Sequence, residues 1–207
     1  NPLLQFLTKV KAKARNITNR QRIIRLLESS IPAIKKDILG QAEDQELQKT
    51  YPQTFGESKF FSGKVFSYIL KTRTYINQLY FKDVLLSELV TVAVLSSLVE
   101  NSYLKRQGDL RFRRGKEFDE LTTTDYFETL QKRLCKIVDD LKVVGPSEVP
   151  TLITEDARTI GRLPFLGIDA VITSPPYLNG TNYFRNTKIE LWFLGYLKTQ
   201  DDLSNFR

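Results

Sequence analysis

The predicted fold class depends on one stretch of the sequence: Val171-Ile172-Thr173-Ser174-Pro175-Pro176-Tyr177-Leu178-Asn179-Gly180. An apolar, β-prone run stops at hydroxyl residues, and two prolines and a tyrosine follow at once. Each proline biases the residue before it toward an extended conformation, so covalent geometry stiffens the turn. Ligands of open α/β sheets bind at the carboxyl ends of the strands. The stretch therefore predicts a buried strand ending in a rigid set of hydrogen-bond acceptors beside an aromatic ring, which suits a flat ligand bearing an amino group.

A second strand is expected just upstream of this turn. Residues 151–154 form a short apolar, β-prone run that is followed by Glu155-Asp156-Ala157-Arg158. A short connection then leads into the strand at 168–173. Two strands that each end in polar residues, joined by a short link, fit neighbouring positions in a Rossmann-like sheet. Asp156 is expected at the edge of that sheet, where it can also cap the helix that follows.

Thr173-Ser174-Pro175-Pro176-Tyr177 resembles the catalytic motif of amino-group DNA methyltransferases, which has the form (Ser/Asn/Asp)-Pro-Pro-(Tyr/Phe/Trp). The context agrees with this resemblance, since Asp169-Ala170-Val171-Ile172 precedes the motif and Asn179-Gly180-Thr181-Asn182-Tyr183 follows it. Glu190-Leu191-Trp192-Phe193-Leu194-Gly195 also resembles the family, and Trp192 is expected in the core. The alternative for the motif is a strand and turn ended by prolines. The resemblance implies an α/β fold: a partial Rossmann-like methyltransferase sheet with a large, mostly helical insertion.

The resemblance also implies which residues act. The catalytic set is Ser174, Pro175, Pro176 and Tyr177, and S-adenosylmethionine is expected at Asp156, Ala157 and Thr173. Serine at the first motif position favours methylation of cytosine N4 over adenine N6. The remaining alternatives are a methyltransferase acting on RNA or a small molecule, and a non-catalytic nucleic-acid-binding relic. Double-stranded DNA is the expected partner, as in a restriction-modification system, and the turn-rich loop after the motif adds Asn179 and Asn182 as nucleic-acid contacts.

A basic run lies in the middle of the chain. Five of the fourteen residues from 101 to 114 are cationic: Lys105, Arg106, Arg111, Arg113 and Arg114. We expect an exposed loop, punctuated at Gly108-Asp109, whose charges contact phosphates without reading sequence. The alternative is an ordinary solvated loop. The net charge of +7 also favours a polyanionic partner, although a generic basic surface would give the same sum.

Composition narrows the chemistry. The 207 residues are 41% hydrophobic and 27% charged, and no apolar run is long enough to cross a membrane. The chain has no histidine and one cysteine, which argues against a metal site, His-based acid–base catalysis and an internal disulfide. Cys135 is expected to be a small buried hydrophobe rather than a nucleophile. The expected compartment is the prokaryotic cytosol.

Periodicity predicts a predominantly helical remainder. Helices are expected at 1–15, 16–31, 34–39, 82–100, 124–142 and 186–197, and a long loop at 41–63. Residues 65–80 fit either a half-buried amphipathic segment or aromatic side chains that stack on bases. The expected organisation is a helical start of the methyltransferase domain at 1–40, a helical and loop insertion at 41–145 that could contact DNA or recognise the target, and the catalytic strands at 146–207. The resemblance places the missing glycine-rich cofactor motif upstream of Asn1-Pro2-Leu3-Leu4.

Overall fold

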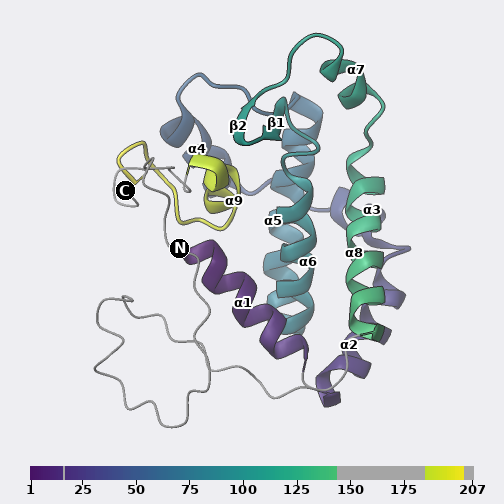
Figure 1. Ribbon diagram of the computed structural model, residues 1–207. Coiled ribbons are helices and arrows are strands. Elements are labelled where there is room, and N and C mark those ends of the chain that lie inside the picture. Colours follow the sequence, from purple (N-terminus) through teal and green to yellow (C-terminus); the bar gives the residue numbers. More distant parts are fainter. Residues whose placement is uncertain (16, 144–184, 203–207) are drawn as a thin grey trace, which may run out of the picture.

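The computed structural model describes residues 1–15, 17–143 and 185–202. This part of the protein is mostly helical, with one small antiparallel sheet (Figure 1). The strands expected at 151–154 and 168–173 lie outside the described residues, so the Rossmann-like sheet stays a prediction. The described elements, in chain order, are α1 (Pro2–Ala14), α2 (Ile17–Ser30), α3 (Ile34–Leu39), α4 (Gln45–Phe55), α5 (Gly63–Lys82), α6 (Val84–Ser97), β1 (Leu104–Gln107), β2 (Asp109–Phe112), α7 (Glu117–Thr122), α8 (Tyr126–Val143), a 3-10 turn (Arg185–Thr187) and α9 (Lys188–Phe193).

Helix α6 is the centre of the fold. Ten of its fourteen residues are buried, because α5, α8, α1 and α2 all pack against it. The apolar composition on nearly all sides of this helix predicts such burial, which is confirmed. The helix begins at Asp83, whose carboxylate accepts a hydrogen bond from the Leu86 amide at 2.8 Å. The second carboxylate oxygen of Asp83 pairs with Arg22 of α2 at 2.5 Å, so one residue starts α6 and holds α2 beside it.

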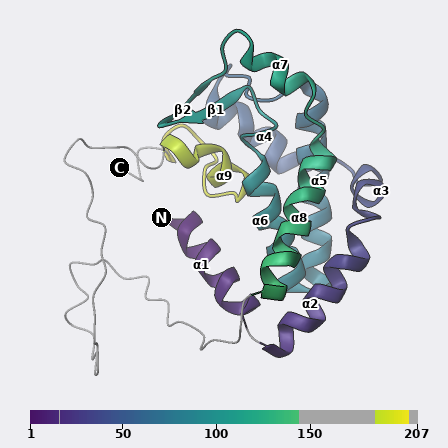
Figure 2. The ribbon, with the colours of Figure 1, turned by 45° about the vertical axis from the view of Figure 1, so that its right-hand side comes forward.

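The N-terminal helices belong to the same core as the middle of the chain. Figure 1 shows α1 crossing α6, and the turned view of Figure 2 places α2 against the end of α8. The predicted helices at 1–15, 16–31, 34–39, 82–100 and 124–142 are confirmed. Asp125 starts α8, as its carboxylate accepts from the amides of Phe127 and Glu128 at 2.9 and 3.0 Å. Buried residues from all of these helices form one hydrophobic cluster.

The loop expected at 41–63 is wrong over much of its length, because α4 forms there. Asp44 caps this helix by accepting from the Leu47 amide at 2.8 Å. Leu47, Tyr51 and Phe55 recur every four residues on one side and pack into the core. Pro52 lies inside the helix, where a proline costs a backbone hydrogen bond. Burial of the adjacent apolar stripe offsets this cost. The proline and the polar composition of the segment concealed this stripe in the sequence.

Residues 65–80 form most of α5, a helix of twenty residues. Tyr75 is buried, and Phe66 and Tyr68 are partly buried against the core. Tyr80 and Phe81 lie at the C-terminal end of the helix and are exposed. The half-buried amphipathic interpretation therefore describes most of residues 65–80, while Tyr80 and the adjacent Phe81 present their rings to solvent.

Helix α9 is attached to α4 and α5 through an aromatic cluster. Trp192 is fully buried, which confirms its predicted place in the core. Its ring centre lies 5.1 Å from that of Tyr51 and 6.2 Å from that of Phe66. The helix expected at 186–197 is shorter than predicted: it ends at Phe193, and Gly195 adopts φ 81°, a left-handed conformation that favours glycine.

Cys135 is exposed, so the expectation of a buried cysteine is wrong. The core side of α8 is formed by Leu130, Leu134 and Val138, spaced every four residues. Cys135 follows Leu134 directly, and one residue rotates the side chain by about 100° around a helix of 3.6 residues per turn. This rotation places Cys135 among polar and charged neighbours instead of in the core.

Candidate functional site

The residues expected to do chemistry lie outside the part of the chain that the structure describes. These residues are Ser174, Pro175, Pro176, Tyr177, Asp156, Ala157, Thr173, Asn179 and Asn182. In the sequence, the described elements nearest to them are α8, which ends at Val143, and the 3-10 turn that begins at Arg185. The described candidate residues are those of the basic run at 101–114, which contacts the 3-10 turn and α9 that follow the motif in the sequence.

The basic run forms a β-hairpin rather than the expected loop. Strands β1 and β2 pair antiparallel, with Leu104 opposite Phe112 and Gln107 opposite Asp109. Gly108 forms the tip alone at φ 73°, a conformation that costs glycine little and other residues more. The Tyr103 amide donates to the Phe60 carbonyl at 2.7 Å, and Leu104 is buried, so the hairpin is anchored at its base.

Acidic side chains of α7 neutralise one side of this hairpin. Arg111 donates two hydrogen bonds to Glu117, each 2.8 Å long, in the paired geometry that guanidinium and carboxylate groups favour. Lys105 lies 3.4 Å from Glu117 and 3.2 Å from Glu120. The Arg111 guanidinium is the main cause that holds the pKa of Glu117 well below its usual range. We call Lys105, Arg111, Arg113, Glu117 and Glu120 the hairpin cluster.

Arg113 has a structural position within this cluster. Its side chain is only 8% exposed. It donates to the backbone carbonyls of Ser102 at 3.0 Å and Glu100 at 3.2 Å, and it pairs with Glu120 at 3.2 Å. These bonds tie the end of α6 to the hairpin and to α7. A side chain buried in this way has its donors directed at the protein.

The hairpin also holds the segment that follows the SPPY motif. The Leu110 amide donates to the side-chain oxygen of Asn186 at 2.8 Å, and the Asn186 amide group donates to Asp109 at 3.1 Å. Arg106 donates to the carboxylate of Glu190, in the first turn of α9. We call Arg106, Asp109, Leu110, Asn186 and Glu190 the hairpin clasp. It joins residues that are 76 to 84 positions apart in the sequence.

Glu190 is the most deeply buried carboxylate of this clasp. Its side chain is 4% exposed, whereas that of Arg106 is 51% exposed. Burial raises the pKa of Glu190, and the charge of Arg106 opposes this rise without cancelling it. Within the described part of the chain, the second carboxylate oxygen of Glu190 is buried without a hydrogen-bond partner. The ion pair is therefore what keeps a carboxylate tolerable at this position.

The five cations predicted to contact phosphates thus have different roles in the structure. Lys105, Arg106, Arg111 and Arg113 make ion pairs within the chain. Arg114 is exposed, and its side chain has no ion pair among residues 1–15, 17–143 and 185–202. Nucleic-acid contact by the set stays a prediction. The acidic partners Glu117 and Glu120, three residues apart and just after the run, are the sequence signal for pairing; nothing local in the sequence indicates Asn186 or Glu190.

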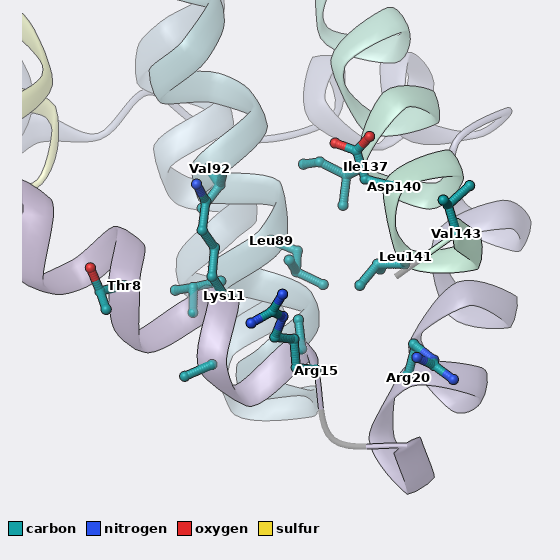
Figure 3. Close-up of a pocket in the computed structure, with 13 residues that line it drawn as sticks. Thr8, Lys11, Arg15, Arg20, Leu89, Val92, Ile137, Asp140, Leu141 and Val143 are labelled. Atoms are coloured by element: carbon teal, nitrogen blue, oxygen red, sulfur yellow. The ribbon is translucent and has the colours of Figure 1, made fainter. Parts of the chain in front are cut away.

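A groove of about 620 Å³ lies at the other end of the bundle, between α1, α6 and α8 (Figure 3). Leu89 and Val92 come from α6, and Ile137 and Leu141 come from α8. Thr8, Lys11 and Arg15 line the α1 side, and Arg20 of α2 lies across from them, as Figure 3 shows. The groove thus has apolar side chains inside, and its charged lining residues are the cations Lys11, Arg15 and Arg20 and the acid Asp140.

The described residues contain no group of three His, Cys, Asp or Glu side chains placed to hold a metal ion. Among them, no helix is both long enough and apolar enough to cross a membrane.

Comparisons of the chain with protein-family models, with curated proteins and with solved structures found no match.

Proposed function

We propose that this protein is an S-adenosylmethionine-dependent DNA methyltransferase that modifies the exocyclic amino group of a base, with cytosine N4 as the preferred target. The single observation that carries the proposal is Thr173-Ser174-Pro175-Pro176-Tyr177 at the end of a β-prone run. Serine rather than aspartate before the two prolines is the reason for preferring cytosine. The described fold is helical, and the Rossmann-like sheet around the motif is part of the proposal.

The amino group of a stacked base is out of reach, so the target nucleotide is extruded from the duplex. Tyr177 stacks on the extruded base. The Ser174 hydroxyl and the Pro175 carbonyl accept hydrogen bonds from the amino group and hold its lone pair out of conjugation with the ring. S-adenosylmethionine, when bound at Asp156, Ala157 and Thr173, supplies the methyl group from a sulfonium sulfur. The reaction requires no nucleophilic cysteine.

The hairpin clasp supports this proposal. Asn186 comes nine residues after Tyr177 in the sequence, and the clasp fixes it to the hairpin by two hydrogen bonds. Glu190 and Trp192 then bury α9 in the core. A turn that must hold a base within hydrogen-bond reach benefits from a rigid attachment on its C-terminal side.

The test uses the full-length protein, plasmid DNA and isotope-labelled S-adenosylmethionine. After digestion of the DNA to nucleosides, mass spectrometry is expected to find N4-methylcytosine. Ser174→Ala and Tyr177→Ala are expected to abolish methyl transfer while the circular dichroism spectrum and the DNA affinity are retained. The matched control is Ser204→Ala, since this serine lies outside the motif.

The outcomes separate the alternatives. N6-methyladenine would move the proposal to the other target base. DNA binding without methylation of any base would favour the non-catalytic relic. Wild-type transfer rates in both motif variants would remove the assignment.

A further inference from the structure

The net charge of +7 equals the excess of cations in residues 1–27, which cover α1 and most of α2. Residues 1–27 contain seven Lys and Arg and no Asp or Glu, since Glu28 is the first acidic residue. The whole chain has 31 cationic and 24 acidic residues, so 24 cations remain beyond position 27, equal in number to the acids. The seven cations are Lys9, Lys11, Lys13, Arg15, Arg20, Arg22 and Arg25. We therefore expect the long-range attraction between this net charge and a polyanion to be strongest at α1 and α2.

Most of these charges are not neutralised within the described part of the protein. Lys13 pairs with Glu88 at 2.6 Å, and Arg22 pairs with Asp83 at 2.5 Å. Four others are exposed and have no ion pair among the described residues: Lys9, Lys11, Arg15 and Arg25. We call these four side chains the basic face. This contrasts with the hairpin cluster, where Glu117 and Glu120 take up the charges of Lys105, Arg111 and Arg113.

Three of these charges come from α1 and its C-terminal cap, and the fourth comes from α2, which packs against α1. Figure 1 shows α1 running toward the start of α2, and Figure 3 shows Lys11 and Arg15 projecting from the last turns of α1. Lys11 and Arg15 are four residues apart, which separates them by about 6 Å along a helix. Their long side chains can therefore reach neighbouring phosphates of one strand, and the planar Arg15 group can bond a phosphate through two donors.

We infer that the basic face is the principal phosphate-contacting surface of this protein, and that its partner is double-stranded DNA. The inference rests on the proposed function for the choice of DNA among polyanions. The contacts are independent of base sequence, because lysine and arginine bind phosphates through charge. They hold the duplex on the helical part of the molecule, while the SPPY motif acts on the extruded base.

The test compares two variants of the full-length protein that lose the same charge. The basic-face variant carries Lys9→Gln, Lys11→Gln, Arg15→Gln and Arg25→Gln. The control variant carries Lys49→Gln, Lys59→Gln, Lys116→Gln and Lys132→Gln, four exposed lysines beyond residue 27. Lysine, arginine and glutamine have similar helix propensities, so both variants are expected to fold, which circular dichroism checks. Binding to an unmodified 20-base-pair duplex is measured without cofactor by fluorescence anisotropy over a range of salt concentrations.

Each phosphate contact contributes about 0.9 to the slope of the logarithm of the binding constant against the logarithm of the salt concentration. Loss of four contacts is expected to reduce the slope by about 3.6. If the contribution of a contact vanishes near 1 M salt, each contact accounts for about eightfold in affinity near 0.1 M. The basic-face variant is therefore expected to bind more than about 100-fold more weakly at that salt, and the control variant to bind within about threefold of wild type.

Equal slopes in the basic-face variant and in wild type would overturn the inference, as would equal losses in both variants. Tighter binding of wild type to phosphatidylserine vesicles than to the duplex would also overturn it, in favour of a membrane partner. If no base is methylated but DNA binding depends on the basic face, the proposed activity is refuted and the DNA-contacting surface is supported. If DNA is methylated and the basic-face variant binds and reacts like wild type, the DNA-contacting surface is refuted and the proposed activity is supported.

Discussion

Arg106→Gln tests the role of the hairpin clasp in stability. The substitution removes the cation that pairs with Glu190 and leaves a side chain of similar polarity on an exposed strand position. Glu190 is 4% exposed and has one oxygen without a partner in the described part of the chain, so the carboxylate loses its principal compensation. Breaking a fully buried pair costs about 3 to 5 kcal/mol. Because the Arg106 side chain is half exposed, water replaces part of the interaction, and we expect a loss of about 2 kcal/mol near neutral pH.

The loss depends on pH in a defined direction. Burial raises the pKa of Glu190 in the folded state above its unfolded value. A group of this kind leaves stability intact below the unfolded pKa, and stability falls as the pH rises through the folded pKa. Removal of Arg106 raises the pKa of Glu190 further and deepens that fall. Arg106→Gln is therefore expected to come closest to wild type at low pH, where the carboxyl is protonated in both, and to diverge from it as the pH rises through the folded pKa of wild type.

The assay is urea unfolding followed by circular dichroism for wild type, Arg106→Gln, Glu190→Gln and the double variant. Glu190→Gln removes the charge and keeps the shape, so we expect a change within about 1 kcal/mol. In that background, Arg106→Gln is expected to cost less than about 0.5 kcal/mol, which gives a coupling energy above about 1 kcal/mol. An equal loss from Arg106→Gln with and without the Glu190 carboxylate, or a loss independent of pH, would refute the role of the ion pair.

Three more predictions concern the helical core and surface. Asp83→Ala is expected to cost about 1 to 2 kcal/mol in urea unfolding because α6 loses its cap, whereas Asp83→Asn keeps the cap and costs less; equal losses would contradict the capping role. Tyr126→Phe removes a buried 2.9 Å hydrogen bond to Thr72 and is expected to cost about 1 kcal/mol in the same assay; an unchanged midpoint would argue against it. Cys135 is exposed, so it is expected to react with a thiol reagent in the native protein. Reaction only after unfolding would mean that Cys135 is buried in the core.

Local signals predicted most of the helices because their causes are local. Pro2 suits the first turn of α1, and the Asp125 carboxylate caps α8 through amides two and three residues away. The apolar composition of α6 predicts burial on nearly all sides without knowledge of its neighbours. The residues proposed for chemistry, Ser174 to Tyr177, also come from the sequence, because the motif is defined by consecutive residues.

Tertiary structure decided which charges are used within the protein and which remain available. The run at 101–114 counts as basic in the sequence, yet Arg106 finds Glu190 84 residues away and Arg113 is buried by backbone carbonyls. Such partners are brought together only by packing, so no local pattern indicates them. The sequence by itself determined the helices, the SPPY motif and the excess of cations in residues 1–27. Only the fold decided that Lys9, Lys11, Arg15 and Arg25 are exposed without an ion pair among the described residues, because Glu117 and Glu120 pair with the hairpin instead.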